Sequence, residues 1–302
     1  MKNGGVLFWK NHMPGKHKTK IYILGASGFL GGRAAEYFSS HDYEVFTDRI
    51  DITDLPALKE GFAKTRPDVV INFAGARAYP TVDWCEDHKI ETVQANVIGA
   101  VNTMTAALES GAYPIQIASG CLYSGGPDKL FTEEDEPNFY GSFYSRMRIV
   151  MQKALVELPV LQARIRMPLS MYSHPRNFFD KIVSYPKVIS IPNSVTLIED
   201  LYPALEKLIK IKPTGILNLT NEGYVEHKNI LEAYKKIVNP SHTYELITLE
   251  QLEGKGGITK ARRSNCVLST EKAKNLGVTM PTIDAERLLE IMTVFKNNKN
   301  AK

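Results

Sequence analysis

The sequence predicts an α/β fold: a doubly wound parallel sheet with helices on both faces and a smaller α+β lobe beside it. From residue 20 onward, short apolar runs alternate with longer segments of helical periodicity, a pattern typical of a parallel sheet covered by helices. A glycine-rich turn joins the first apolar run to the first helical segment. The 302 residues suffice for one large domain or for two modest ones that share a core.

The first half of the chain predicts its elements in order. A strand over 21–24, a helix over 29–39, a strand over 44–47 and a helix over 55–64 lead to a buried strand at 69–73. The clearest helix runs over 88–110, with Gly111 as its C-terminal stop. Its apolar residues repeat at three- and four-residue steps and so share one face. They are Ile90, Val93, Val97, Val101, Met104 and Leu108.

The second half completes the sheet and adds the lobe. A strand at 114–119, a loop at 124–138, a helix at 142–157 and a strand at 161–166 close the doubly wound unit, and residues 216–220 add one more core strand. We expect one domain over residues 20–168 and a more irregular lobe built from 169–200 and 221–295. Residues 1–19 are predicted to be a disordered basic tail and residues 296–302 a second tail.

Composition and charge exclude several classes of protein. Apolar residues make up 43% and no run approaches the ~20 residues that a membrane span needs. Three cysteines without paired spacing argue against a disulfide framework or a zinc site, so no metal is expected. The chain has a net charge of +4, but eight lysines lie near its two ends and the remainder has a net charge of −4. This negative charge on the folded part argues against nucleic-acid binding. The short apolar patch at 6–9 does not suit a signal peptide, so the expected location is the cytoplasm.

The turn after the first strand predicts a dinucleotide site. Its three glycines permit a tight turn, close approach of a pyrophosphate, and close packing of the helix whose free N–H groups face the phosphates. Residues 20–168 are therefore the expected dinucleotide-binding domain. The expected contacts are Gly25, Ser27, Gly28, Phe29, Leu30 and Gly31 in the turn, and Ala74 and Gly75 after the third strand.

The choice between NADP and NAD depends on residues after the second strand. Asp48 could hold a ribose 2′-hydroxyl and favour NAD, whereas Arg49 could hold a 2′-phosphate. Asp51 and Ile52 are expected to contact the adenine. We favour NADP, with NAD as the alternative.

Further strings occur in a specific order. They are Val82-Asp83-Trp84-Cys85-Glu86, Gly120-Cys121, the run 137–145, Arg164-Ile165-Arg166-Met167-Pro168, Pro175-Arg176-Asn177-Phe178, Ile191-Pro192-Asn193-Ser194 and Arg263-Ser264-Asn265. On these strings, over roughly residues 20–295, the chain resembles the extended short-chain dehydrogenase/reductases. Within them it is most similar to the bifunctional nucleotide-rhamnose synthases, which are 3,5-epimerase/4-reductases of a UDP- or dTDP-linked 4-keto-6-deoxy-glucose. The dTDP-4-dehydrorhamnose reductases look like more distant relatives.

The resemblance implies a set of reductase residues. Ser119 matches the family's active-site Ser/Thr, which orients the C4 carbonyl oxygen, and Tyr144 matches the tyrosine that protonates this oxygen as hydride arrives. The family's lysine four residues later is Arg148 here. Tyr144 and Arg148 share a helix face, so a cation is retained, although with a planar fork instead of an ammonium. Arg148 and Pro168 join the expected cofactor contacts.

The resemblance also implies an acid and a base for epimerisation. Cys121 matches the base and Lys181 the acid, on opposite faces of the sugar ring. His174 is a competing proton donor. Substrate binding is expected from Asn177, Asn193 and Arg263, the last through its fork on the diphosphate.

Three alternatives remain open from sequence. The chain could be an epimerase with weakened reduction because of Arg148, a non-catalytic NADP-binding regulatory subunit, or a reductase of an unrelated small ketone. The expected partner is a nucleotide sugar, and a homodimer is the default assembly because dimerisation through helices is common in the superfamily.

Overall fold

The computed structural model describes residues 18–76 and 81–300. Six parallel strands form the central sheet in the order β10-β6-β4-β3-β1-β2. They are β1 (Thr19–Leu24), β2 (Tyr43–Phe46), β3 (Val69–Asn72), β4 (Tyr113–Ser119), β6 (Leu161–Ile165) and β10 (Gly215–Asn218). The chain winds in opposite directions from β1 and β3, so a crevice for a ligand is expected at the carboxyl ends of these two strands. The predicted doubly wound fold is confirmed.

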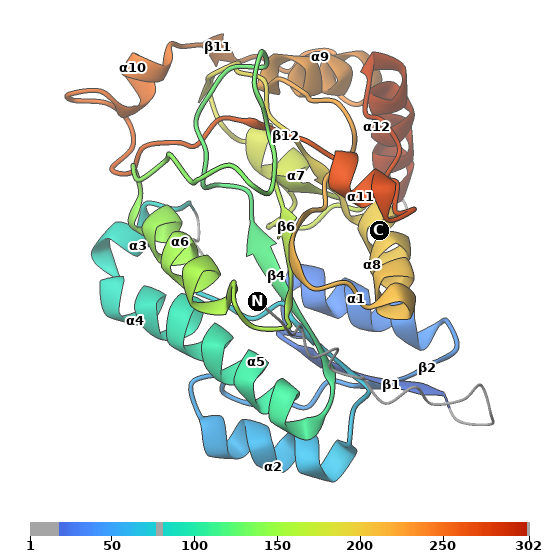
Figure 1. The fold of residues 1–302 in the computed structure, drawn as a ribbon. Coiled ribbons are helices and arrows are strands. Elements are labelled where there is room, and N and C mark those ends of the chain that lie inside the picture. Colours follow the sequence, from blue (N-terminus) through green and yellow to red (C-terminus); the bar gives the residue numbers. More distant parts are fainter. Residues whose placement is uncertain (1–17, 77–80, 301–302) are drawn as a thin grey trace.

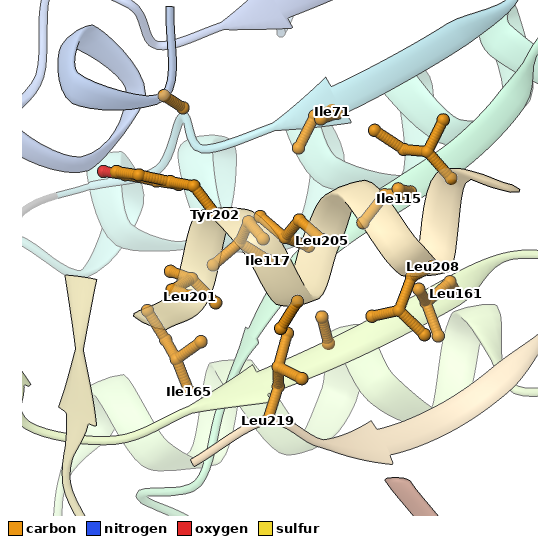
Figure 2. Close-up of a cluster of buried hydrophobic side chains, with 14 of the residues drawn as sticks. Ile71, Ile115, Ile117, Leu161, Ile165, Leu201, Tyr202, Leu205, Leu208 and Leu219 are labelled. Carbon is orange, nitrogen blue, oxygen red and sulfur yellow. The ribbon is translucent and has the colours of Figure 1, made fainter. Parts of the chain in front are cut away.

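Helices cover both faces of the sheet (Figure 1). On one face lie α1 (Phe29–Ser39) and α8 (Ile198–Ile211), and on the other lie α2 (Leu55–Thr65), α5 (Gly99–Ser110) and α6 (Phe143–Leu155). Figure 2 shows α8 packing Leu201, Leu205 and Leu208 onto apolar side chains of the strands. At roughly 25 cal/mol per Å² of apolar surface removed from water, such burial is the main stabilising contribution to the fold.

The long helix predicted over 88–110 is interrupted. It consists of α4 (Lys89–Val93), a π-helical turn (Gln94–Ile98) and α5, which ends at Gly111 with φ +80° as predicted. A π turn holds more residues than an α turn and rotates everything before it relative to everything after it. The predicted single apolar face is therefore wrong at its start, where Ile90 is 75% exposed while Met104 is buried.

The smaller lobe has its own apolar core. Its helices α7 (Phe178–Ile182), α9 (His227–Ile237) and α12 (Ala285–Asn300) pack together through Phe179, Ile230 and Phe295. The remaining elements are short and lie in the smaller lobe or in the segments that connect it to the sheet. They are α3 (Trp84–Asp87), β5 (Leu130–Phe131), β7 (Pro168–Leu169), β8 (Lys187–Val188), β9 (Thr196–Leu197), β11 (Glu245–Leu246), α10 (Leu249–Glu253), β12 (Val267–Leu268) and α11 (Glu271–Asn275).

Three observed boundaries differ from the predicted ones. Strand β1 already includes Thr19, and residues 1–17 of the predicted basic tail lie outside the described residues. Helix α8 begins at Ile198 and packs on the sheet, although residues 198–200 were assigned to the lobe. Helix α12 continues to Asn300, so Lys296 and Lys299 lie on a helix and not in a tail. Among the described helices, none has the length and apolar character that crossing a bilayer requires.

Candidate active site

A cavity of about 510 Å³ lies between the carboxyl edge of the sheet and the smaller lobe. The larger domain contributes Cys121, which follows β4, and Tyr144, in the first turn of α6. The lobe contributes Lys181 from α7 and Arg263 from the segment before β12. Three of the five predicted catalytic residues thus line one cavity.

Ser119 is the last residue of β4 and supports two of these side chains. Its Oγ accepts a hydrogen bond from the backbone N–H of Cys121 at 3.1 Å, and its side chain is hydrogen-bonded to Tyr144. Ser142 caps α6 by accepting from the N–H of Ser145 at 3.0 Å, which fixes the helix turn that carries Tyr144. Ser119 and Tyr144 therefore stand where they could hold one carbonyl oxygen.

The pKa of Tyr144 reflects opposing influences. Burial raises the pKa of the phenol, while the positive charge of Arg148 and the hydrogen bond with Ser119 lower it. Burial is the larger effect, so the pKa lies above its ordinary value although the ring is partly accessible from the cavity. The guanidinium carbon of Arg148 lies 5.9 Å from the ring centroid, so the predicted cation is present beside the ring.

Arg148 and Asn96 present buried donors at the end of β3. Arg148 donates through Nη2 to the carbonyl of Ile117 at 2.6 Å, and Asn96 accepts from the N–H of Ala76 at 3.0 Å. Within the described part of the chain, Arg148 Nε and Asn96 Nδ2 have no hydrogen-bond partner. A Cβ at Gly75 would lie 2.7 Å from Asn96 Oδ1. Because buried donors normally find acceptors, these atoms fit hydroxyls of a bound ribose.

The glycine turn has the geometry expected of a pyrophosphate cradle. Gly25 has φ +78°, and a Cβ there would lie 2.7 Å from the backbone nitrogen of Ala74. A Cβ at Gly31 would lie 2.4 Å from the carbonyl oxygen of Gly25, so α1 can approach the turn this closely only with glycine. The first turn of α1 holds no acidic side chain, which leaves its N–H groups free for an anion.

The predicted adenine and 2′-phosphate contacts separate into two groups. Asp48 and Arg49 are both exposed after β2 and accessible to a ligand. Asp51 accepts from the N–H and Oγ1 of Thr53, which lowers the pKa of its carboxyl. Ile52 is 7% exposed and belongs to the apolar core. Arg49 is therefore the better placed of these residues to discriminate between NADP and NAD.

Lys181 and His174 differ in their positions. Lys181 lines the cavity, and burial lowers the pKa of its ammonium, with a smaller contribution from the charge of Arg176. His174 does not line the cavity: its ring stacks on Phe29 with centroids 4.5 Å apart, and its Nδ1 accepts from the N–H of Arg176. The geometry favours Lys181 over His174 as a proton donor.

The three predicted substrate-binding residues have different surroundings. Asn177 is fully buried, caps α7 and donates to the carbonyls of Ser170 and Tyr172, so its amide supports the backbone and does not reach the cavity. Asn193 borders the cavity, yet its Oδ1 accepts from Arg166. Arg263 forms a two-pronged ion pair with Asp83, each contact 3.0 Å long.

Arg166 and His227 also line the cavity, although no site role was assigned to them from sequence. Asp83, whose string Asp83-Trp84-Cys85 was expected to line the sugar pocket, lines it too. Arg166 donates to the Sγ of Cys121 at 3.3 Å. Burial lowers the pKa of His227 to about 4. Arg166 and Asp83 lie in strings that carried the resemblance. A charged residue at the buried end of a predicted strand was the available signal for Arg166.

Comparison with known proteins shows which proteins this chain resembles. A bifunctional dTDP-4-dehydrorhamnose 3,5-epimerase/dTDP-4-dehydrorhamnose reductase from Arabidopsis thaliana is 35% identical over 93% of this chain and 94% of its own length. Three longer plant relatives match over only 40 to 43% of their own length.

Solved structures give the same picture. The L780 UDP-rhamnose synthase from Acanthamoeba polyphaga mimivirus superposes with a TM-score of 0.86 and 30% identity, covering 92% of this chain and all of its own. A dTDP-4-dehydrorhamnose reductase from Bacillus anthracis, solved in complex with NADP, shares the fold at 18% identity, with a TM-score of 0.78 and coverage of 95% of this chain and 100% of its own. The family model described as the RmlD substrate binding domain matches residues 19–295. The predicted resemblance is confirmed, and the chain belongs to the RmlD substrate-binding family.

Proposed function

We propose that the chain is a 3,5-epimerase/4-reductase that converts a nucleotide-linked 4-keto-6-deoxy-glucose to the nucleotide-linked L-rhamnose. One observation carries the proposal: Cys121, Tyr144 and Lys181 line a single cavity. The names of the plant relative and the mimivirus synthase support the same reaction class, with dTDP in one case and UDP in the other.

NADP is the cofactor that we propose, a choice supported by its presence in the B. anthracis reductase. The glycine turn and the N-terminus of α1 would hold the pyrophosphate, and Arg49 the 2′-phosphate. Arg148 Nε and Asn96 Nδ2, both buried without partners in the described residues, would donate to the ribose beside the nicotinamide. Bound NADPH supplies a hydride for C4 of the sugar.

Epimerisation begins with removal of a proton from C3 or C5. The thiolate of Cys121 takes the proton, and the electron pair of the C–H bond moves toward the C4 carbonyl, which gives an enolate. Ser119 and Tyr144 donate hydrogen bonds to its oxygen. The ammonium of Lys181 returns a proton to the opposite face, which inverts the carbon. Burial of Lys181 lowers its pKa and makes this transfer easier.

Reduction uses the same oxygen contacts. As the hydride reaches C4, the hydroxyl of Tyr144 gives its proton to O4. The charge of Arg148 stabilises the tyrosinate that remains, and this partly offsets the effect of burial on the pKa of Tyr144. Co-location of Cys121, Tyr144 and Lys181 in one cavity disfavours a non-catalytic regulatory subunit.

Separate assays of the two half-reactions test the proposal. The protein is incubated in D₂O with UDP- or dTDP-linked 4-keto-6-deoxy-glucose, and deuterium at C3 and C5 is followed by mass spectrometry alongside NADPH oxidation. We expect both events, and we expect Cys121→Ser to slow deuterium uptake by at least about 100-fold. The same variant should still reduce a 4-keto-L-rhamnose nucleotide, which needs no epimerisation. Absence of both events with both nucleotides would contradict the proposal.

Weakened reduction is the second candidate, and one observation favours it. The Nη2 of Arg148 is committed to the carbonyl of Ile117 at 2.6 Å, so its fork is not free to act as the family's ammonium does. Deuterium uptake at C3 and C5 without NADPH oxidation would support this candidate over the bifunctional one.

Assembly as a homodimer in the cytoplasm completes the proposal. Helix α4, the π turn and α6 pack together. Four apolar side chains on these elements, or directly after α6, are more than 40% exposed: Ile90, Ile98, Val150 and Val156. A second copy would remove this surface from water. Native mass spectrometry should give twice 33.8 kDa, and a monomer at micromolar concentration would contradict a dimer. Three free cysteines suit a reducing compartment.

A further inference from the structure

Arg166 is a buried cation beside the sulfur of the proposed base. It follows β6 directly and is 2% exposed. Its Nε and Nη2 donate to the Oδ1 of Asn193, and Nη2 also donates to the carbonyl of Ser264 at 2.6 Å. Its Nη1 donates to the carbonyl of Gly120 at 3.3 Å, to Ser264 Oγ at 3.2 Å and to Cys121 Sγ at 3.3 Å.

Every oxygen in this set is neutral. The partners are an amide, two carbonyls and a hydroxyl, and in the described part of the chain no carboxylate pairs with Arg166. Removing a guanidinium from water costs several kcal/mol unless a counter-charge compensates it. The sulfur of Cys121 is the partner here that can become an anion, so the charge of Arg166 acts on that atom.

We propose that Arg166 is the positioning residue of Cys121: it fixes Sγ at the cavity wall and stabilises the thiolate that removes the sugar proton. This inference rests on the proposed function for the identity of the base, and it adds a residue to which nothing in the resemblance gave a role. The backbone of Gly120 and the amide of Asn193 hold the guanidinium in place. Ser264 Oγ is oriented in turn, because it donates to the carbonyl of Tyr123 at 2.6 Å.

Of the other titratable groups that line the cavity with Cys121, the carboxylate of Asp83 is paired with the guanidinium of Arg263. The remaining groups near the thiol carry no negative charge at neutral pH. Burial raises the pKa of Tyr144 on α6 and of Cys266 before β12. Burial, with the charge of Arg166 as a smaller cause, lowers the pKa of His227 on α9 to about 4, so this ring is neutral at pH 7. Lys181 on α7 lines the same cavity as a second cation. The local field around the thiol is therefore positive.

Alkylation by iodoacetamide measures the thiolate without any substrate. Cys85 and Cys266 are fully buried, whereas Cys121 is partly accessible, so peptide mapping by mass spectrometry isolates the rate at Cys121. An opposite charge in contact changes the thiolate fraction by about tenfold or more. We expect Arg166→Met to slow alkylation at pH 7 about tenfold and Arg166→Lys to restore most of the rate. The rates of the variants should converge at alkaline pH, where thiols in general ionise without a neighbouring cation.

Arg164→Met is the matched control. Arg164 lies two residues earlier on β6, is equally buried, and donates to Gln152 and Asn218 instead of to a sulfur. Its loss should perturb the fold comparably without changing the alkylation rate at pH 7 by more than about twofold. An equal loss in Arg164→Met, or an unchanged rate in a folded Arg166→Met, would overturn the inference. If Arg166→Met does not fold, Arg166→Gln removes the charge and keeps hydrogen-bonding capacity, and a rate in Arg166→Gln equal to that of Arg164→Gln decides against the inference as well.

A second readout separates this inference from the proposed function. In D₂O, Arg166→Met should slow deuterium uptake at C3 and C5 about tenfold, and by more than it slows reduction of a 4-keto-L-rhamnose nucleotide, and Arg166→Lys should restore most of the uptake. If the unmodified protein exchanges no deuterium while Arg166→Met still slows alkylation, the epimerase function fails and the link between Arg166 and the thiolate stands.

Discussion

Lys181, the proposed proton donor, carries a cost in stability. Its ammonium lies on α7 at the cavity wall, where burial lowers its pKa below the ordinary value of 10.5. The unfolded chain therefore binds this proton more readily than the folded one, so the charge opposes folding at pH values below the lowered pKa. Stability lost in this way returns as the pH rises from the lowered pKa toward 10.5.

We expect Lys181→Met to raise the free energy of unfolding at pH 7 by about 1 kcal/mol, while proton return in the epimerase reaction is lost. The gain should shrink above pH 10.5, where the wild-type amine is neutral in both states. Urea unfolding at pH 7 and pH 10.5 measures both values. Phe179→Ala, which opens the core behind α7, is the opposing control and should destabilise by about 3–5 kcal/mol at either pH. A less stable Lys181→Met at pH 7 would show that Lys181 is not a destabilising charge.

At the scale of elements, the contact between the glycine turn and α1 decides whether a dinucleotide can bind. A Cβ at Gly31 would lie 2.4 Å from the carbonyl oxygen of Gly25, a backbone atom that cannot move cheaply. Gly31→Ala must push α1 away from the turn. We expect a loss of about 1–3 kcal/mol in stability and at least a tenfold weaker affinity for NADPH, measured by urea unfolding and by fluorescence titration.

Gly126→Ala provides the comparison for that variant. Gly126 lies in an exposed loop, has no positive φ, and a Cβ there would have no neighbour closer than 4.0 Å. The substitution should leave NADPH affinity unchanged and leave stability equal or slightly higher. If Gly31→Ala behaves like Gly126→Ala, the close approach of α1 to the turn is not what forms the site.

The same elements show what the sequence could and could not predict. Helix α1 matches the predicted 29–39, and the six sheet strands lie within two residues of their predicted bounds, because buried apolar runs between turns depend on local patterning. The π turn at Gln94–Ile98 escaped prediction, since no residue type marks it. The pairing of β5 with β12 joins residues far apart in sequence, which periodicity does not report.

Within the site, motif matches located residues better than they assigned contacts. Cys121, Tyr144 and Lys181 meet in one cavity as the resemblance implied. Asn177 was expected to bind substrate, but its buried amide caps α7. Asparagine is a common N-cap residue, so its position before a helix does not distinguish a capping role from a binding role. No role was assigned to Arg166 from sequence, because the function of a buried guanidinium depends on which residues lie near it in space. The strand pattern does not identify those residues.

For the molecule as a whole, side-chain contacts join the larger domain to the smaller lobe. Arg263, before β12, pairs with Asp83, which precedes α3. Phe29, at the start of α1, stacks on His174 of the segment before α7. Hydrogen bonds from Arg263 and from the N–H of Ala261 hold the pKa of Asp83 below its ordinary value, although burial opposes them as the largest single effect. Cofactor and substrate sites therefore share one framework, and a ligand at either should stabilise the whole chain.

Cofactor-dependent stabilisation gives the test of NADP against NAD. A ligand present at 100 times its Kd stabilises the folded state by about 2.7 kcal/mol, so thermal unfolding reports affinity directly. Arg49 is exposed after β2, beside the equally exposed Asp48, and its guanidinium would attract a 2′-phosphate that the carboxylate would repel. We expect NADPH to raise Tm more than NADH does, and Arg49→Met to remove the difference. Lys64→Met, at the far end of α2, changes the net charge equally and should leave the preference intact. If NADH stabilises the wild-type chain at least as much as NADPH does, then Asp48 binds the ribose 2′-hydroxyl and NAD is the cofactor.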